Sequence, residues 1–110
     1  MAKHVLVVYT NAAKGRDDDF NDWYDNIHIG EVLALPGFLS AQRFRVGDTQ
    51  MGPPPSHRYL ALYEFEADSL ADVSRSFIEN AGKMKMSDAI DLSTAVTHIY
   101  TATGPRKTKK

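Results

Sequence analysis

Blocks of apolar residues along the chain predict four strands. The block 4–10 is β-branched and apolar almost throughout, which is typical of a buried strand. Blocks 38–46 and 94–103 predict two further strands, and block 58–66 predicts another because its residues alternate. A polar loop over 47–56 carries three prolines in a row, and we expect it to lie outside the sheet because proline cannot donate a ladder hydrogen bond.

A helical period predicts a long helix over about 18–35. The carboxylates of Asp17, Asp18 and Asp19 suit the positive end of the helix dipole and can act as N-caps. Pro36-Gly37 ends the helix. We expect the helix to be loosened at Gly30.

A second helix is expected from Asp68 or Ser69 to about residue 80, and one or two helical turns over 84–92. The order is then β-α-β-β-α-β, the ferredoxin-like pattern, an α+β fold with a four-stranded antiparallel sheet and both helices on one face. The other face carries apolar and aromatic residues. Because such a patch must be covered, we expect two such sheets to pack together in a homodimer.

Length and composition fit one small domain. The chain has 110 residues, of which 43% are hydrophobic and 25% charged, as in ordinary globular proteins. We expect a single domain over 1–103 and a disordered basic tail over 104–110. Thirteen basic against 14 acidic residues leave a net charge of −1, which argues against a nucleic-acid partner.

Cysteine is absent, which excludes disulfides, zinc-thiolate sites and a thiol nucleophile. The longest apolar run, Val5–Tyr9, is too short to cross a membrane, and no signal peptide follows Met1. We therefore expect a cytoplasmic protein with no membrane partner.

The first predicted helix carries the candidate chemistry. At about 100° per residue, Trp23 and Tyr24 lie on its apolar stripe, His28 lies at the edge of the stripe, and Glu31 lies near its middle. Side chains three residues apart can touch, and a carboxylate beside an imidazole fixes its tautomer and raises its pKa. His28 and Glu31 are therefore the candidate catalytic acid/base pair.

Two structural alternatives stay open for this pair. An edge histidine on an amphipathic helix is often half-exposed and inert. A break at Gly30 would turn Glu31 to solvent or toward Arg43 or Arg45. No two histidines have the i, i+4 spacing of a helical metal site, so no metal is expected.

Strand residues could complete a substrate site. Tyrosine hydroxyls and an arginine can stabilise negative charge that develops on a substrate oxygen, although strand aromatics often serve packing alone. The candidate substrate-binding residues are Trp23, Tyr24, Arg43, Tyr59, Tyr63 and His98.

The first helix and its end resemble the EthD-like proteins of the dimeric α+β barrel superfamily. The residues that carry the resemblance are Phe20, Trp23-Tyr24, His28, Leu33, Pro36-Gly37-Phe38 and an arginine in the next strand. The resemblance is densest over 17–46, and the order of elements extends it to about residue 102. It implies a homodimer with sheets packed face to face, a pocket between each sheet and its helices, and His28 as the acid/base. This chain departs from the family in lacking cysteine and in having Gly30 where relatives carry proline.

These features predict a small cofactor-independent enzyme of lyase or isomerase type. It would act next to a carbonyl or an alkene of a hydrophobic aromatic, lactone or polyketide-like metabolite, in catabolism, without cofactor or metal. Three alternatives remain: a non-catalytic ligand-binding or accessory protein, a cofactor-free quinol monooxygenase, and an interaction module that uses the basic tail.

Overall fold

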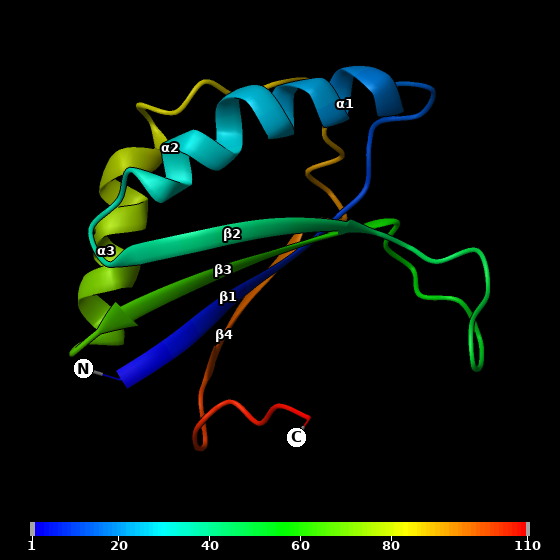
Figure 1. The fold of residues 1–110 in the computed structure, drawn as a ribbon. Coiled ribbons are helices and arrows are strands. Elements are labelled where there is room, and N and C mark those ends of the chain that lie inside the picture. Colours follow the sequence, from blue (N-terminus) through cyan, green and yellow to red (C-terminus); the bar gives the residue numbers. More distant parts are fainter. Residues whose placement is uncertain (1, 110) are drawn as a thin grey trace.

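The computed structural model describes residues 2–109, and its elements follow the predicted order (Figure 1). They are β1 (Ala2–Thr10), α1 (Asp17–Trp23), a π-helical turn η1 (Tyr24–His28), α2 (Ile29–Leu33), β2 (Phe38–Arg45), β3 (Tyr59–Ala67), α3 (Leu70–Ala81) and β4 (Val96–Thr101). The strands form one antiparallel sheet of order β2-β3-β1-β4. The helices lie on one face of this sheet (Figure 1). The predicted ferredoxin-like α+β fold is confirmed.

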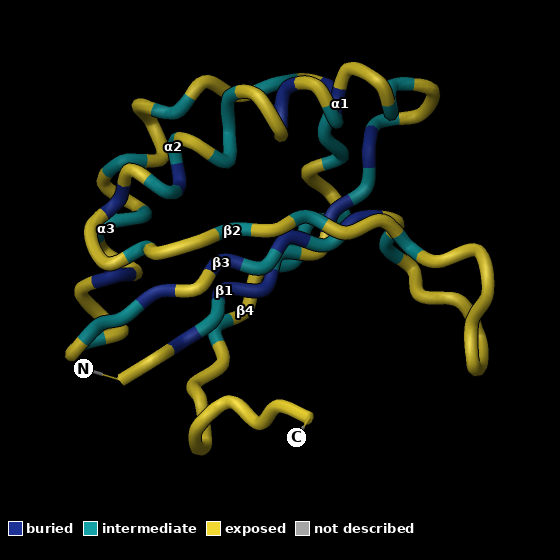
Figure 2. The backbone as a smooth tube through the Cα atoms, in the orientation of Figure 1, coloured by how far each residue is buried: buried dark blue, intermediate teal, exposed yellow. Residues whose placement is uncertain are grey.

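The core lies between the sheet and the helices. Leu6 on β1 is opposite Tyr63 on β3 and Ile99 on β4, so these side chains share the helix-facing side. Buried positions alternate along β3, and further buried positions lie on the helices above the sheet (Figure 2). Residues from both layers form one hydrophobic cluster. Aromatic side chains dominate the packing, because Phe20, Tyr24, Tyr63 and Phe65 are all at most 1% exposed.

The helix distortion lies at Tyr24–His28, not at Gly30 as predicted. Residues 17–33 form one continuous helical stretch, and Gly30 lies inside its regular part. A π turn holds an extra residue, so it rotates everything that follows it relative to a regular helix. As a result Val32, which is 1% exposed, faces the core, and Glu31 does not. Burying an apolar side chain there avoids the cost of desolvating a carboxylate.

Residues 84–92 are irregular, so the predicted helical turn there is wrong. Their main chain instead bonds the segment after β1: Ala13 N donates to Ala89 O at 2.6 Å, and Asp91 N donates to Asn11 O at 2.9 Å. Because these long-range bonds already satisfy the main chain, no helix is needed. The last strand is also shorter than predicted.

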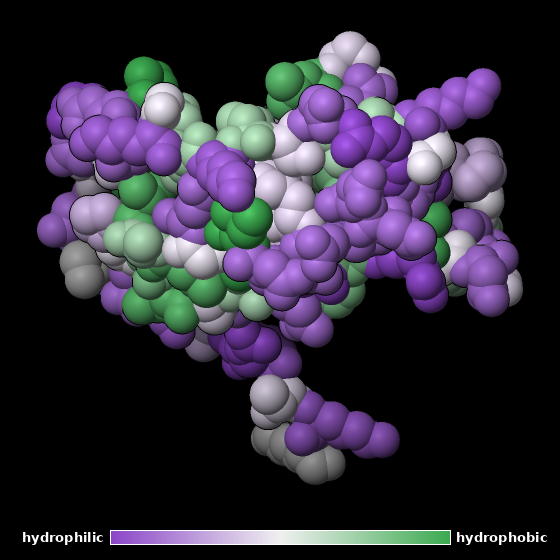
Figure 3. All heavy atoms as spheres, turned by 90° about the horizontal axis from the view of Figure 1, so that it is seen from above, coloured by the Kyte–Doolittle hydropathy of each residue, from purple (hydrophilic) through white to green (hydrophobic). Residues whose placement is uncertain are grey.

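The open face of the sheet carries exposed apolar and aromatic side chains. They include Tyr9, Phe44 and Tyr100, at 36%, 40% and 60% exposure. The helix side, seen in Figure 3, is mostly hydrophilic, with hydrophobic side chains in small separate groups. Residues 104–109 form neither helix nor strand and lie below the open face (Figure 1), where Arg106 pairs with Glu64 at 3.1 Å. Disorder of this tail stays a prediction.

Candidate active site

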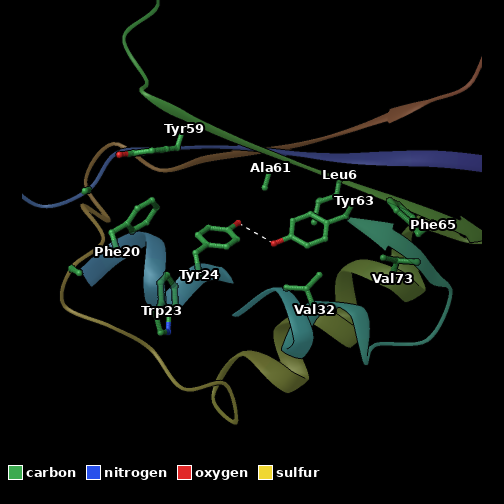
Figure 4. Packing of buried hydrophobic residues seen from close by; sticks show 12 residues of the cluster. Leu6, Phe20, Trp23, Tyr24, Val32, Tyr59, Ala61, Tyr63, Phe65 and Val73 are labelled. Atoms are coloured by element: carbon green, nitrogen blue, oxygen red, sulfur yellow. Dashed lines mark hydrogen bonds between the residues drawn. The ribbon is translucent and has the colours of Figure 1, made fainter. Parts of the chain in front are cut away.

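His28 is the last residue of the π turn and packs between two aromatic rings. Its imidazole stacks on Trp23, with ring centroids 4.7 Å apart and planes 20° apart. The Tyr24 ring meets it edge-on at 5.0 Å. Trp23 points away from the sheet, whereas Tyr24 points toward it (Figure 4). The stacked face of His28 therefore lies on the Trp23 side of the helix, away from the space over β3.

Glu31 lies beside the imidazole. Its Oε1 is 3.5 Å from Nδ1 of His28, and the two side chains are 22% and 18% exposed. Both atoms are buried without another partner. At this distance the contact is not an aligned hydrogen bond; such contacts in ligand-free sites often tighten when substrate binds. The other carboxylate oxygen, Oε2, accepts the N–H of Lys85 at 2.6 Å.

Burial decides the charge of His28. It lowers the pKa of the imidazole below its ordinary value of 6.5, and the neighbouring Glu31 carboxylate opposes this only in part. The carboxylate thus raises the pKa as expected, but the effect of burial is larger. A neutral ring whose Nδ1 faces a carboxylate keeps its proton on Nδ1 and has a lone pair on Nε2. Within residues 2–109, Nε2 has no hydrogen-bond partner.

Arg43 connects β2 to the first helix and does not contact Glu31. Its guanidinium donates to Asp25 Oδ1 and Asn21 Oδ1, both at 2.9 Å. It lies over the Tyr24 ring, 4.4 Å from the centroid. Nε is buried and has no partner. The Nε–H of Arg43 is therefore available to an additional acceptor.

Tyr24 and Tyr63 fill the space between the helix and the sheet. The Tyr63 hydroxyl donates to the Tyr24 hydroxyl at 3.0 Å, and this bond spans the two layers (Figure 4). Burial raises the pKa of both hydroxyls, so both stay protonated. A substrate could not reach Tyr63, at 0% exposure, without moving Tyr24.

Removing one of these hydroxyls is expected to destabilise the fold. Tyr63→Phe leaves the Tyr24 hydroxyl buried without its partner, which costs about 1–3 kcal/mol of the free energy of unfolding. Tyr24→Phe combined with Tyr63→Phe removes both polar groups, so the double variant should lose less than the sum of the single losses. Urea denaturation of the three variants measures this coupling, and strictly additive losses would contradict it.

Two further predicted residues lie apart from His28. Tyr59 donates to Asp17 Oδ2 at 2.6 Å, and this bond lowers the pKa of Asp17. His98 is opposite Val7 on β1. Val7 points to the other face of the sheet from its neighbour Leu6, so His98 faces the open side. Within this chain His98 cannot line a site with Tyr59, Tyr63 and Arg43.

A hollow of about 440 Å³ opens at the edge between α1 and β2. Its lining includes Asn21, Asp25, Ile29, Ala41, Arg43 and Tyr59. Neither His28 nor Glu31 lines it, although Ile29 follows His28 in the chain. The predicted residues thus divide into a base cluster (Trp23, Tyr24, His28, Glu31) and an edge hollow that contains Arg43 and Tyr59.

Sequence reasoning missed the polar partners of both groups. Asn21 and Asp25 are one helical turn apart, so their spacing could have marked them as partners of an arginine. The main chain of Lys85 gave no comparable signal. Residues 2–109 contain no group of three or more histidine, aspartate or glutamate side chains placed to hold a metal ion. No helix in that range is both long and apolar enough to span a membrane.

No family model and no curated protein sequence matches this chain. Solved structures do match. An EthD-like protein from Ralstonia eutropha is 14% identical, with 96% of both chains covered and a TM-score of 0.60. SnoaB, a cofactor-independent oxygenase from Streptomyces nogalater, is 11% identical, with 100% of both chains covered and a TM-score of 0.57.

A DABB family protein with a ferredoxin-like fold from Mesorhizobium loti is 14% identical over 94% of this chain and 100% of its own, with a TM-score of 0.56. At such low identities these likenesses show the fold. It is the ferredoxin-like fold of EthD-like and DABB proteins, as the resemblance of residues 17–46 implies.

Proposed function

We propose that this protein is a small cofactor-independent enzyme in which His28 removes a proton from a hydrophobic substrate. The observation that carries the proposal is an imidazole whose Nδ1 lies 3.5 Å from a buried carboxylate oxygen and whose burial lowers its pKa. A base of lowered pKa stays unprotonated at neutral pH, which general base catalysis requires.

The reaction follows from the chemistry of this pair. Nε2 takes the proton from a carbon next to a carbonyl or an alkene, and the C–H electrons form an enolate or dienolate. The imidazolium that results lies beside Glu31, whose negative charge stabilises it. If the proton returns to another carbon, the reaction is an isomerisation; if a leaving group departs, it is an elimination. Both outcomes are of the lyase or isomerase type.

The substrate is an aromatic, lactone or polyketide-like metabolite. Trp23 and Tyr24, both buried, make the immediate surroundings of His28 apolar and aromatic. Arg43, with its unpaired Nε, and Tyr59 line the edge hollow and suit a carbonyl or anionic oxygen. Tyr63 contributes only indirectly, through its hydrogen bond to the Tyr24 hydroxyl. His98 has no role within one protomer.

A cofactor-free oxygenase is an alternative that shares the first step. The likeness in fold to SnoaB supports it. The carbanion would add to O₂, forming a C–O bond; the peroxide would take the proton back and lose water to leave a ketone. Oxygen uptake with a hydroquinone, followed with an oxygen electrode, separates this reaction from isomerisation or elimination.

A non-catalytic ligand-binding protein is the other candidate. It is favoured by the edge hollow, whose lining does not include His28. Turnover of nitrobenzisoxazole tests both readings, because one proton removed from its ring carbon breaks the N–O bond and releases a coloured nitrophenolate. We expect the protein to be faster than free imidazole at equal concentration. A rate no higher than that of imidazole would overturn the enzymatic proposal.

We also infer a homodimer that forms through the open face of the sheet. Leu62 lies at the centre of this face, opposite Val7 on β1 and Gln42 on β2. Leu62→Arg should convert the dimer to a monomer in light scattering, because the charge would be desolvated in the interface. Ile78→Arg makes a similar change on α3, where Ile78 is already 74% exposed, and should leave the dimer intact. A monomeric wild type would contradict the inference.

A further inference from the structure

The main chain of Lys85 bonds two neighbours of His28. Its N–H donates to Glu31 Oε2 at 2.6 Å, and its carbonyl accepts the indole N–H of Trp23 at 2.7 Å. Lys85 belongs to the irregular segment between α3 and β4, and it is far from both partners in sequence. One residue of this segment therefore holds both the carboxylate beside His28 and the ring stacked on it.

We propose that the main chain of Lys85 positions the His28–Glu31 pair, an inference that rests on the proposed function of this pair. A glutamate side chain has several rotatable bonds, and Glu31 is partly exposed, so nothing in α2 itself keeps its carboxylate on the imidazole. The N–H of Lys85 fixes Oε2, and the geometry of the carboxylate then directs Oε1 toward Nδ1.

The bond from Trp23 anchors the segment itself. It fixes the position of Lys85 along the first helix. The Lys85 N–H is then within reach of Glu31, which lies two helical turns after Trp23. The segment is also secured at its two ends, where Met84 N donates to Ala81 O and Ala13 N donates to Ala89 O. These bonds hold a segment without regular structure in one place.

The Lys85 side chain takes no part in this arrangement. Residue 85 is exposed and its ammonium forms no ion pair with the residues that the structure describes. This provides a matched pair of variants. Lys85→Ala removes the side chain and keeps the N–H, whereas Lys85→Pro also removes the N–H but keeps the carbonyl that binds Trp23.

The test combines a histidine titration with turnover. Glu31 is the charged group that supports the protonated form of His28, while its other neighbours, Trp23 and Tyr24, are uncharged. In Lys85→Pro the pKa of His28, followed by NMR and assigned with His28→Gln, should fall relative to Lys85→Ala. The nitrobenzisoxazole rate should fall by roughly 10–100-fold, since small misplacements have effects of this size.

Three outcomes decide the inference. Lys85→Pro should add nothing to Glu31→Gln, because both changes act through the same contact. Equal pKa and rate in Lys85→Pro and Lys85→Ala would overturn the inference. If Lys85→Pro does not fold, amide exchange decides: the Lys85 amide should be protected in the wild type and exchange faster in Glu31→Ala, and unchanged exchange would overturn the inference.

The proposed function is tested by a separate result. A wild type that does not turn over nitrobenzisoxazole overturns the enzymatic role of His28. The titration and the exchange experiment still report whether Lys85 positions Glu31, because neither depends on a substrate.

Discussion

Replacing His28 by glutamine is expected to lower the rate of proton removal from nitrobenzisoxazole by about 10²–10⁴-fold, the usual contribution of a general base. Glutamine keeps the polar character and much of the size of the side chain but has no basic nitrogen. The Trp23 ring and the Glu31 carboxylate stay in place, so the loss reports the base itself. The rate is measured from the absorbance of the released nitrophenolate.

The control for this variant is His57→Gln. His57 is a second half-buried histidine outside the base cluster, and its Nε2 already bonds the carbonyl of Thr94 at 2.6 Å. This change should leave the rate within about twofold of the wild type, since it removes an imidazole that has a structural partner. Equal losses in the two variants would show that His28 has only a structural role.

The pH dependence of the wild-type rate follows from the same geometry. The base acts only when neutral, and burial holds the pKa of His28 below 6.5. The rate should therefore be level across neutral pH and fall only as the pH drops through this lowered pKa. Glu31→Gln removes the charge that opposes the shift, so it should move the fall to still lower pH. A midpoint of this fall above pH 6.5 would contradict the assignment.

Replacing Gly37 by alanine is expected to cause a large loss of stability. Gly37 joins α2 to β2 with φ of +88°, a conformation that costs a residue with a side chain about 1–3 kcal/mol. A Cβ atom there would also lie 2.6 Å from the carbonyl oxygen of Glu66. The backbone of β3 would have to move, because Gly37 O also accepts the N–H of Glu66 at 3.0 Å. We expect a loss of about 3 kcal/mol in the free energy of unfolding, the upper end of this range.

Gly15→Ala separates the two causes. Gly15 also has a positive φ, +76°, but no atom lies within 4 Å of the Cβ position. Its loss should reflect backbone strain alone and be smaller than that of Gly37→Ala. Urea denaturation of both variants gives the difference, which measures the close contact with Glu66. Equal losses would show that the contact relaxes without cost.

The base cluster was only partly accessible to sequence reasoning. Trp23, Tyr24, His28 and Glu31 could be placed near one another because helical spacing alone brings them together. The regular helix that this reasoning assumed would have put Glu31 over the sheet. The π turn instead puts Val32 there and turns Glu31 toward Lys85. No local residue marks that turn, since the choice between Val32 and Glu31 is made by burial against the sheet.

The edge hollow shows the same division. The alternation predicted for 58–66 is seen in β3, where Tyr59 and Tyr63 are both buried and share one face. His98 was expected to join them, yet it faces the opposite side, because the β1–β4 register pairs it with Val7. Alternation assigns side chains to two sets within a strand, and only the pairing of strands decides which set faces the helices.

Periodicities between near neighbours in the chain were enough to predict the order of the elements, the antiparallel sheet and the residues of the first helix. The tertiary structure decided the helical register after Tyr24, the partner of Glu31 and the side on which His98 lies. These features depend on contacts between distant residues, such as the 54 positions that separate Glu31 from Lys85. Their energies appear only when the helix has packed on its sheet.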